Sequence, residues 1–251
     1  MRIITIQNKK GGVGKTTFLL HLAYRAVERK LRTLVIDLDT QANASTSLTQ
    51  DHGLLKLPGG SATLFTAQRQ DDLPIREVTP LLHLLHGHTR LDEVDSLFDV
   101  PYVRERFLPH QIPLLRSLPY DVLLFDTAPS AGPRQIAPLF LADLVLIPLL
   151  ADDFAISGLA QTHDDVETAR RLNPNLKTEI LVNMYRTNSR SQAQALNQLR
   201  EISSIRLREP FFPLRDHVPA ALSAGVPVWA FKTAKSSLRA LWRNFATEAL
   251  Q

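Results

Sequence analysis

The strongest constraint on the fold is a glycine-rich run at residues 9–17, which directly follows a short apolar segment at residues 3–7. The run reads Lys-Lys-Gly-Gly-Val-Gly-Lys-Thr-Thr. When such a turn joins a strand to a helix, its backbone N–H groups converge on an anion, and its lysine and hydroxyl contact phosphate oxygens and Mg²⁺. The run therefore predicts a phosphate-binding loop. The residues expected around the phosphates are Gly11, Gly12, Val13, Gly14, Lys15, Thr16 and Thr17.

Two positions of this run depart from the common pattern of phosphate-binding loops. Lys9 stands where that pattern has its first glycine, and a further lysine, Lys10, precedes Gly11. A cation at the position of Lys10 is badly placed to reach a phosphate held by its own loop, but it is well placed to reach one held by a facing subunit. Lys10 therefore suggests a phosphate site that is shared between two subunits.

Composition limits the class of protein. With 251 residues the chain suits one α/β domain, residues 1–251, that buries a substantial core. Cysteine is absent, so the thiolate ligands of an iron–sulfur cluster are excluded. The chain shows no secretion signal at its start and no apolar run near the roughly 20 residues that span a bilayer. We therefore expect a cytoplasmic protein.

Apolar runs alternate with helical patterns along the chain, which predicts an α/β fold with a mostly parallel twisted sheet and helices on both faces. Residues 50–118 are less regular, with helices expected near 90–98 and 101–108, and we assign no chemistry to them. The expected strands are residues 3–7, 33–37, 121–126, 143–149 and 178–183. The other expected helices are residues 16–29, 156–172, 191–202 and 236–250.

Aspartates stand at the ends of two predicted strands. Asp37 and Asp39 close the second strand, and Asp126 closes the third. Because ligands of a parallel sheet bind at the carboxyl ends of its strands, we expect these carboxylates near the phosphate-binding loop. The histidine-rich run at residues 83–88 has no cysteine or acid at ligand spacing. We interpret that run as an ordinary transition from strand to loop.

Four motifs in this order resemble the ParA/MinD family of deviant Walker-type ATPases, especially its short, Soj-like partition members. Residues 8–17 are similar to the opening motif, residues 37–45 to the first switch, and residues 122–130 to the Walker B strand and second switch. Residues 212–213 and 221–228 are similar to the adenine-side loop and closing segment. The resemblance covers essentially the whole chain. It implies a P-loop NTPase fold and Mg²⁺-dependent hydrolysis of ATP to ADP and phosphate.

The resemblance also implies roles for individual residues. Asp39 would orient or deprotonate the attacking water, and Lys10 would contact the nucleotide of the opposite subunit in a homodimer. Asn183 and Pro213 stand where relatives contact adenine, and both also fit ordinary loop positions. The implied catalytic residues are Lys10, Lys15, Asp39 and Asp126, and the implied metal-binding residues are Thr16, Asp37 and Asp126.

The chain departs from the family in four places, one of which is Ala220 in place of a frequent glutamate. Thr40 and Ala42 replace the proline and glycine that are common in the first switch, and Leu214 replaces an arginine that often follows the proline at position 213. No helix-turn-helix domain precedes the first strand, so we do not expect autoregulation of an operator. These departures leave nucleotide binding intact and affect the details of hydrolysis and DNA contact.

The C-terminal quarter is basic. From residue 186 onward ten Lys and Arg stand against four acids, a surplus of six, whereas the rest of the chain is slightly negative. Such a surface indicates polyanion binding through counterion release, or simply a solvated face. The resemblance favours nonspecific double-stranded DNA. The expected DNA contacts are Arg186, Arg190, Arg208, Arg215, Lys232 and Lys235.

The favoured interpretation is a nucleoid-associated ATPase that segregates or positions a plasmid, chromosome or other cargo. A ParB-like or other adaptor would stimulate its hydrolysis. One alternative is a MinD-like membrane-associated ATPase, because residues 238–250 carry an apolar stripe on the last helix. That stripe suits a core-packing helix better. Another alternative is a phosphorylating metabolic enzyme, which Lys10 argues against because such relatives generally lack that lysine.

Overall fold

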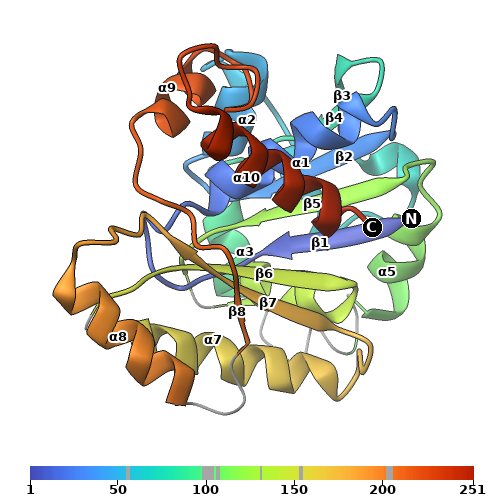
Figure 1. Ribbon diagram of the computed structural model, residues 1–251. Coiled ribbons are helices and arrows are strands. Elements are labelled where there is room, and N and C mark those ends of the chain that lie inside the picture. Colours follow the sequence, from blue (N-terminus) through green and yellow to red (C-terminus); the bar gives the residue numbers. More distant parts are fainter. Residues whose placement is uncertain (55–56, 98–104, 106–107, 131, 153–154, 202–205) are drawn as a thin grey trace.

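Eight strands form one sheet in the computed structural model, which describes residues 1–54, 57–97, 105, 108–130, 132–152, 155–201 and 206–251 (Figure 1). The strands are β1 (Arg2–Ile6), β2 (Thr33–Leu38), β3 (Arg76–Thr79), β4 (Leu82–Leu85), β5 (Val122–Thr127), β6 (Leu144–Leu150), β7 (Lys177–Asn183) and β8 (Leu207–Arg208). Their order is β3-β4-β2-β5-β1-β6-β7-β8, and β3 alone runs antiparallel to its neighbour. The predicted α/β fold with a mostly parallel sheet is confirmed.

Helices cover both faces of the sheet (Figure 1). One face carries α1 (Lys15–Glu28), α2 (Asn43–Thr49), α9 (His217–Ser223) and α10 (Ser236–Ala249). The other face carries α3 (Leu91–Leu97), α5 (Leu108–Arg116), α6 (Pro133–Ile136), α7 (Ala155–Arg170) and α8 (Arg190–Glu201). The 3₁₀ segments are η2 (Gly60–Phe65), η3 (Gln70–Asp72) and η5 (Ala137–Phe140).

The apolar strands are buried because each side of the sheet has its own core. In β1, Ile3 packs into the core beneath α7 and α8, whereas Ile4 and Ile6 pack into the core beneath α1 and α10. Successive side chains of a strand point to opposite faces, so both faces of a doubly covered strand must be apolar. This requirement explains why the strands appear in the sequence as continuous apolar runs.

The last helix packs into the core, as its apolar stripe predicted. On α10, Trp242 and Phe245 are at most 2% exposed, and they lie against the rings of Phe18 and Phe212. An aromatic cluster of this kind removes a large apolar area from water. The stripe therefore stabilises the domain and leaves little apolar surface on α10 for a membrane. Among the described residues no helix is long and apolar enough to cross a bilayer.

The structure also contains elements that the sequence did not indicate. The predicted strands and the helices outside residues 50–118 agree with the structure to within two residues at each end, but β3, β8, α2, α6 and α9 were not predicted. The helix expected near 90–98 is α3. Most of the helix expected at 101–108 lies outside the described residues, and α5 begins at Leu108. Pro113 lies inside α5. Proline is unfavourable within a helix, so the sequence of this segment did not indicate one.

The central strands bring the predicted motifs together. The carboxyl end of β1 leads into the glycine-rich run, and β5 pairs with both β1 and β2. In this register Asp126 stands beside Ile6 on one side and beside Asp37 on the other. The carboxyl ends of parallel strands meet at one edge of a sheet, which is where α/β proteins bind ligands. The fold therefore places all three motifs at a single edge.

Candidate functional site

The glycine-rich run forms a loop whose backbone only glycine accommodates. Gly12 and Gly14 have φ angles of 73° and 100°, and α1 begins directly after Gly14. A Cβ atom on Gly14 would lie 2.4 Å from Nδ2 of Asn183, so a side chain would also collide with this asparagine at the end of β7. The loop therefore presents the N-terminus of α1 to the cleft, which is a common way of binding phosphate.

Asn183 fixes the position of this loop through a hydrogen bond. It is 5% exposed, and its Nδ2 donates a hydrogen bond to the carbonyl of Val13 at 2.9 Å. A separate pocket of about 340 Å³ lies beside the loop, and neither Asn183 nor Pro213 lines it. The structure thus gives Asn183 a positioning task, and the adenine contacts expected of Asn183 and Pro213 stay predictions. The lining residues of that pocket include Asp152, Met184, Arg186, Gln192 and Leu214.

The three lysines of the loop have different partners. Lys15 is 8% exposed, and its Nζ donates to the carbonyls of Asn8 and Lys10 at 3.0 and 3.2 Å. Burial lowers the pKa of Lys15, although Asp126 and Asp39 act against this shift. Lys15 therefore lies inside the loop, where the predicted phosphate contact requires it. The other two lysines point elsewhere.

Lys9 pairs with a carboxylate within α7, and Lys10 pairs with one that precedes this helix. Lys9 Nζ lies 2.8 Å from Oδ2 of Asp165, and Lys10 forms an ion pair with Asp152. The side chains of Lys10 and Asp152 are 35% and 37% exposed, so this pair remains in contact with solvent. Lys10 thus lies at the rim of the loop and contacts Asp152 of its own chain, a contact that the sequence did not indicate.

The metal-binding side of the cleft joins α1 to β5. Thr16 Oγ1 donates to Oδ2 of Asp126 at 2.7 Å. The other oxygen, Oδ1 of Asp126, is buried and has no hydrogen-bond partner among the described residues. Burial, and then the neighbouring Asp37, raise the pKa of Asp126 well above its usual value. A hard cation would satisfy this uncompensated oxygen together with the Thr16 hydroxyl, so these residues fit Mg²⁺.

Asp37 supports the first switch from within the core. It is fully buried, and it accepts hydrogen bonds from the backbone N–H of Asp39 at 3.1 Å and of Ser45 at 2.9 Å. The Ser45 hydroxyl donates a third bond at 2.6 Å. Burial raises the pKa of Asp37 to about 6. These contacts hold the switch in place, and the direct role of Asp37 at the metal stays a prediction.

Asp39 itself faces the cleft. Its side chain is half-buried, and Oδ1 accepts a hydrogen bond from the backbone N–H of Gln41 at 2.9 Å. Ala42, which stands where relatives commonly have glycine, adopts the left-handed conformation with φ 47°. A glycine would take this conformation without strain. Ala42 therefore adopts a backbone conformation that suits glycine, the residue that the family pattern has at this position.

Residues 50–118 contribute to the site, although we assigned no chemistry to them. Ser61 Oγ donates to the carbonyl of Asp37 at 2.5 Å, and the backbone N–H of Gly87 donates to Ser45 Oγ at 2.9 Å. These bonds continue the network beneath the first switch. The histidine-rich run ends β4 and enters a loop, as expected, and no cluster of metal-binding side chains occurs among the described residues.

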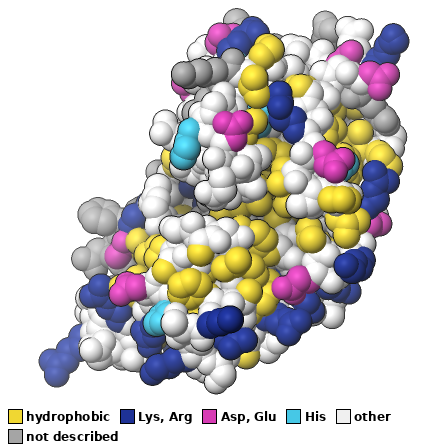
Figure 2. Space-filling view, turned by 90° about the horizontal axis from the view of Figure 1, so that it is seen from above, with side chains coloured by type: hydrophobic (Ala, Val, Ile, Leu, Met, Phe, Trp, Pro, Cys, Tyr) yellow, Lys and Arg dark blue, Asp and Glu magenta, His cyan; other side chains and the backbone are white. Residues whose placement is uncertain are grey.

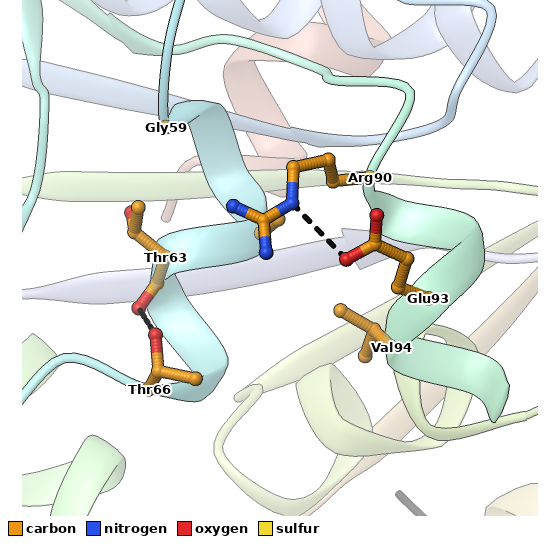
Figure 3. A pocket seen from close by; sticks show the side chains of 7 residues that line it. Gly59, Thr63, Thr66, Arg90, Glu93 and Val94 are labelled. Carbon is orange, nitrogen blue, oxygen red and sulfur yellow. Dashed lines mark hydrogen bonds and ion pairs between the residues drawn. The ribbon is translucent and has the colours of Figure 1, made fainter. Parts of the chain in front are cut away.

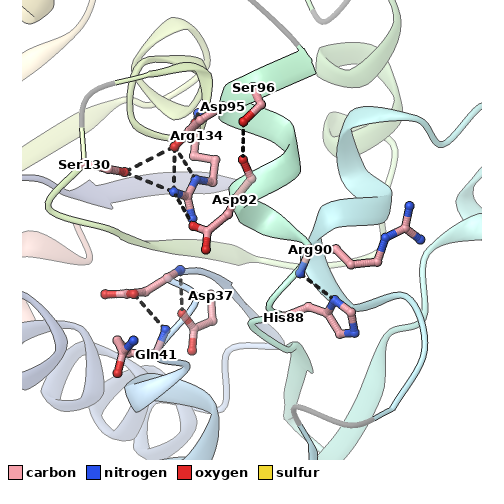
Figure 4. A network of polar contacts seen from close by, with 10 residues as sticks. Asp37, Gln41, His88, Arg90, Asp92, Asp95, Ser96, Ser130 and Arg134 are labelled. Atoms are coloured by element: carbon pink, nitrogen blue, oxygen red, sulfur yellow. Dashed lines mark hydrogen bonds and ion pairs between the residues drawn. The ribbon is translucent and has the colours of Figure 1, made fainter.

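These elements enclose a cleft of about 560 Å³, which is large enough for a small-molecule ligand. Asp92, Ser130 and Arg134 line the cleft and were not predicted (Figure 4). An arginine eight positions after the Walker B aspartate was the available signal, but no pattern in one sequence distinguishes it from a surface arginine. The predicted residues that line the cleft are Gly11, Gly12, Gly14, Lys15, Thr16, Thr17 and Asp39.

Another hollow lies between η2 and α3 and is much smaller than the cleft (Figure 3). Its volume is about 90 Å³, and the pair formed by Arg90 and Glu93, with Nε and Oε2 3.0 Å apart, lies at its edge. Thr63 and Thr66 line the opposite side. This hollow has room for only a few water molecules, at roughly 30 Å³ each. The larger cleft, which the phosphate-binding loop and Asp39 line, is therefore the candidate site.

The basic residues of the C-terminal quarter divide into two groups. Five of the six expected DNA contacts are exposed, and no acid pairs with them in the described parts of the chain. Arg208 differs, because it pairs with Glu179 and Glu248 and its side chain is 16% exposed. Figure 2 shows Lys and Arg side chains spread around the margin of the face seen from above, with acids among them. The exposed residues are Arg186, Arg190, Arg215, Lys232 and Lys235.

Comparison with known proteins defines the class. A family profile described as an AAA domain matches residues 1–178. The chain is 32% identical over 235 residues to the chromosome partitioning protein ParA of Myxococcus xanthus, covering 90% of this chain and 80% of that protein. Together with the phosphate-binding loop and its facing aspartates, these matches identify a P-loop ATPase. The chain belongs to the ParA family, as its four motifs predicted.

Solved structures agree on the fold. McdA of Cyanothece superposes with a TM-score of 0.80 at 19% identity, and the match covers all of both chains. Cobyrinic acid a,c-diamide synthase of Mycobacterium smegmatis, solved with bound ADP and magnesium, gives a TM-score of 0.77 at 22% identity over 98% of this chain and 93% of that one. Proteins with different tasks share this fold, so the particular task must be argued from the site.

Proposed function

We propose that this chain is a DNA-associated positioning ATPase. In this proposal two subunits bind ATP and Mg²⁺ face to face, the dimer binds duplex DNA without sequence preference, and hydrolysis releases it. A ParB-like or other adaptor stimulates hydrolysis, so that a plasmid, a chromosome or another cargo is moved along the nucleoid. The observation that carries the proposal is the position of Lys10, at the rim of a loop whose phosphate site already contains Lys15.

Different residues at the cleft perform different parts of the proposed reaction. Lys15 and the loop N–H groups bind the phosphates, and Thr16 and Asp126 hold the metal. Mg²⁺, when bound, neutralises charge on the phosphate oxygens. Asp39 orients the attacking water and accepts its proton. Lys10 leaves Asp152 and contacts the nucleotide of the opposite subunit, so hydrolysis requires the dimer.

The basic surface supports the DNA-binding part of the proposal. Arg186, Arg190, Arg215, Lys232 and Lys235 are exposed, with no acid paired to them in the described ranges, so their charges are available to phosphates. Dimerisation doubles the number of these cations on one particle. Each phosphate that they neutralise releases counterions, which makes binding steeply dependent on salt and indifferent to sequence. We omit Arg208 from this set because two glutamates neutralise it.

Light scattering with ATP, ADP or no nucleotide tests the dimer. The parent should be dimeric only with ATP and Mg²⁺, and Lys10→Ala should remain monomeric while still binding ATP. Lys9→Ala is the matched control, because Lys9 is the neighbouring loop lysine and pairs with Asp165 in the same way. If Lys10→Ala dimerises and hydrolyses ATP like the parent, the shared-site proposal is wrong.

A further inference from the structure

A buried arginine joins α3 to the second switch. Arg134 is 4% exposed and lies on α6. Its Nη2 lies 2.6 Å from Oδ2 of Asp95 and 3.2 Å from Oδ1 of Asp92, and its Nε donates to Asp95 at 2.8 Å. Nη2 also donates to Oγ of Ser130 at 3.3 Å. Figure 4 shows the guanidinium between the two α3 carboxylates and the serine.

This arrangement is a poor way to stabilise a fold. The guanidinium gives up its hydration because the Arg134 side chain is 4% exposed, whereas the side chains of Asp95 and Asp92 are 18% and 73% exposed. Well-packed apolar side chains in place of a buried charge are often equally stable or more so. Arg134 carries an additional cost, because its Nη1 is buried and has no hydrogen-bond partner among the described residues. Packing alone therefore does not account for an arginine here, and the specific geometry that it imposes is the better explanation.

The geometry fixes one wall of the cleft. Ser130 Oγ donates a hydrogen bond to Oδ2 of Asp95 at 3.4 Å and accepts one from Nη2 of Arg134. Two hydrogen bonds therefore hold the serine from two sides. Gly132 brings the turn against α3: its φ is 144°, and a Cβ there would lie 2.7 Å from Oδ1 of Asp95. The segment that this clamp restrains follows Asp126 directly and lines the cleft through residues 128–130.

We propose that Arg134 is a positioning residue for ATP hydrolysis. Through Asp95 and Ser130 it fixes the wall formed by residues 128–130 opposite Lys15 and Thr16, where the terminal phosphate and the attacking water must be aligned. The inference rests on the proposed ATPase reaction. Because the reacting atoms must lie in a near-attack geometry, a shift of about 1 Å in such a wall costs up to about 100-fold in rate.

The test compares three substitutions of Arg134 by steady-state kinetics, ADP titration and thermal unfolding. Arg134→Met removes the charge and retains most of the volume, so it should keep the unfolding temperature and the affinity for ADP. Its kcat should fall about 10- to 100-fold with KM within about twofold of the parent. Arg134→Lys should recover part of kcat because it restores the ion pair with Asp95, and Arg134→Gln should resemble Arg134→Met.

The control is Arg25→Gln, since Arg25 is also a partly buried, ion-paired arginine but lies on α1, where it pairs with Glu28 and donates to Thr247 of α10. It should leave kcat unchanged. If Arg134→Met keeps the parent's kcat, or if kcat falls only as far as ADP affinity and stability fall, Arg134 is merely structural and the inference is overturned. A parent that does not turn over ATP would overturn the proposed function and this inference with it.

Discussion

The cleft and the C-terminal surface of this protein carry similar kinds of charge in opposite settings. Lys15 lines the cleft, and Asp37 and Asp126 are buried beside it; all three are nearly or fully buried, and each has identified partners. On the C-terminal surface, charges such as Arg215 and Lys232 are exposed, and no acid pairs with them within the described residues.

The difference shows what each region is suited to do. Charges in the low-dielectric cleft interact strongly and must be placed within fractions of an ångström, which is what phosphoryl transfer requires. Charges on the surface interact through screened fields over several ångströms, which suits a partner that is itself a repeating polyanion. Substitutions in the cleft should therefore have large and specific effects, and those on the surface should have small and additive ones.

The largest effect should come from Asp39. Asp39→Ala removes the group that orients the water and leaves the phosphate-binding loop intact, so ATP should bind and the dimer should persist. The rate of hydrolysis should fall about 10²- to 10⁴-fold, which is the usual contribution of a general base. Single-turnover assays with radiolabelled ATP measure the rate, and filter binding measures retention. An equal loss of ATP binding in Asp39→Ala and Lys15→Ala would show that the two residues do not have separate roles.

The interior should also impose a pH dependence that the surface does not. His21 is fully buried, where its Nδ1 contacts the carbonyl of Thr17 and its Nε2 accepts from the N–H of Val228. Burial lowers its pKa to about 4, whereas the unfolded chain has an ordinary histidine. The unfolded state therefore binds more protons between these values, and stability should decrease as pH falls from about 6.5 to 4, by of the order of 2–3 kcal/mol.

Denaturant unfolding of the parent and of His21→Gln across this pH range isolates the histidine contribution. The parent should lose more stability than the variant as pH falls, because the variant has no group to protonate at this position. Other buried groups contribute equally to both proteins and cancel in the difference. Identical pH profiles would mean that His21 is not held neutral in the folded state.

On the surface, the exposed and the neutralised arginines should behave differently. Replacing Arg215 and Lys232 together by alanine should weaken DNA binding and reduce the log–log salt slope by about 0.9 for each lost contact. Arg208→Ala is the matched control, since Arg208 belongs to the same basic quarter but pairs with Glu179 and Glu248. Fluorescence anisotropy over a salt series measures both. A larger loss from Arg208→Ala than from the double variant would reverse the assignment.

The smallest effect should come from Asp152, whose partly exposed ion pair with Lys10 lies at the rim of the phosphate-binding loop. Asp152→Asn removes the carboxylate that pairs with Lys10 and should favour its transfer to the partner subunit. Because partly exposed ion pairs contribute about 0.2–1 kcal/mol, the ATP-dependent dimer should tighten by about 1.4- to 5-fold for each of its two Lys10–Asp152 pairs. Asp165→Asn, which releases Lys9 instead, should leave the dimer unchanged. Equal effects in sedimentation velocity would indicate a general charge effect.

The sequence predicted the cleft far better than its supports. The loop, Asp39 and Asp126 were predicted because phosphate chemistry requires those residue types directly after apolar strands. Ser61 and Gly87 hold the first switch, but a serine and a glycine in an irregular region carry no distinguishing pattern. These contacts join segments that lie far apart in the chain, and no periodic pattern of residues indicates them. They cannot be predicted from a single sequence.

The same limit applies to the DNA contacts that were predicted in the C-terminal quarter. Counting charges indicated a basic quarter, but a count does not show which cations are already neutralised. Arg208 pairs with Glu179 of β7 and with Glu248 of α10, which are 29 and 40 positions away. The strands and helices themselves were predictable because both faces of the sheet are covered, which makes every central strand a continuous apolar run.

The central claim is that the nucleotide in the cleft controls the basic surface. The most direct test is fluorescence anisotropy of the parent on two unrelated duplexes of equal length, with ATP or with ADP, at several salt concentrations. The account predicts tight binding with ATP, weak binding with ADP, equal affinity for both duplexes and a steep decrease with salt. Equal binding with ADP, or a strong preference for one duplex, would contradict it.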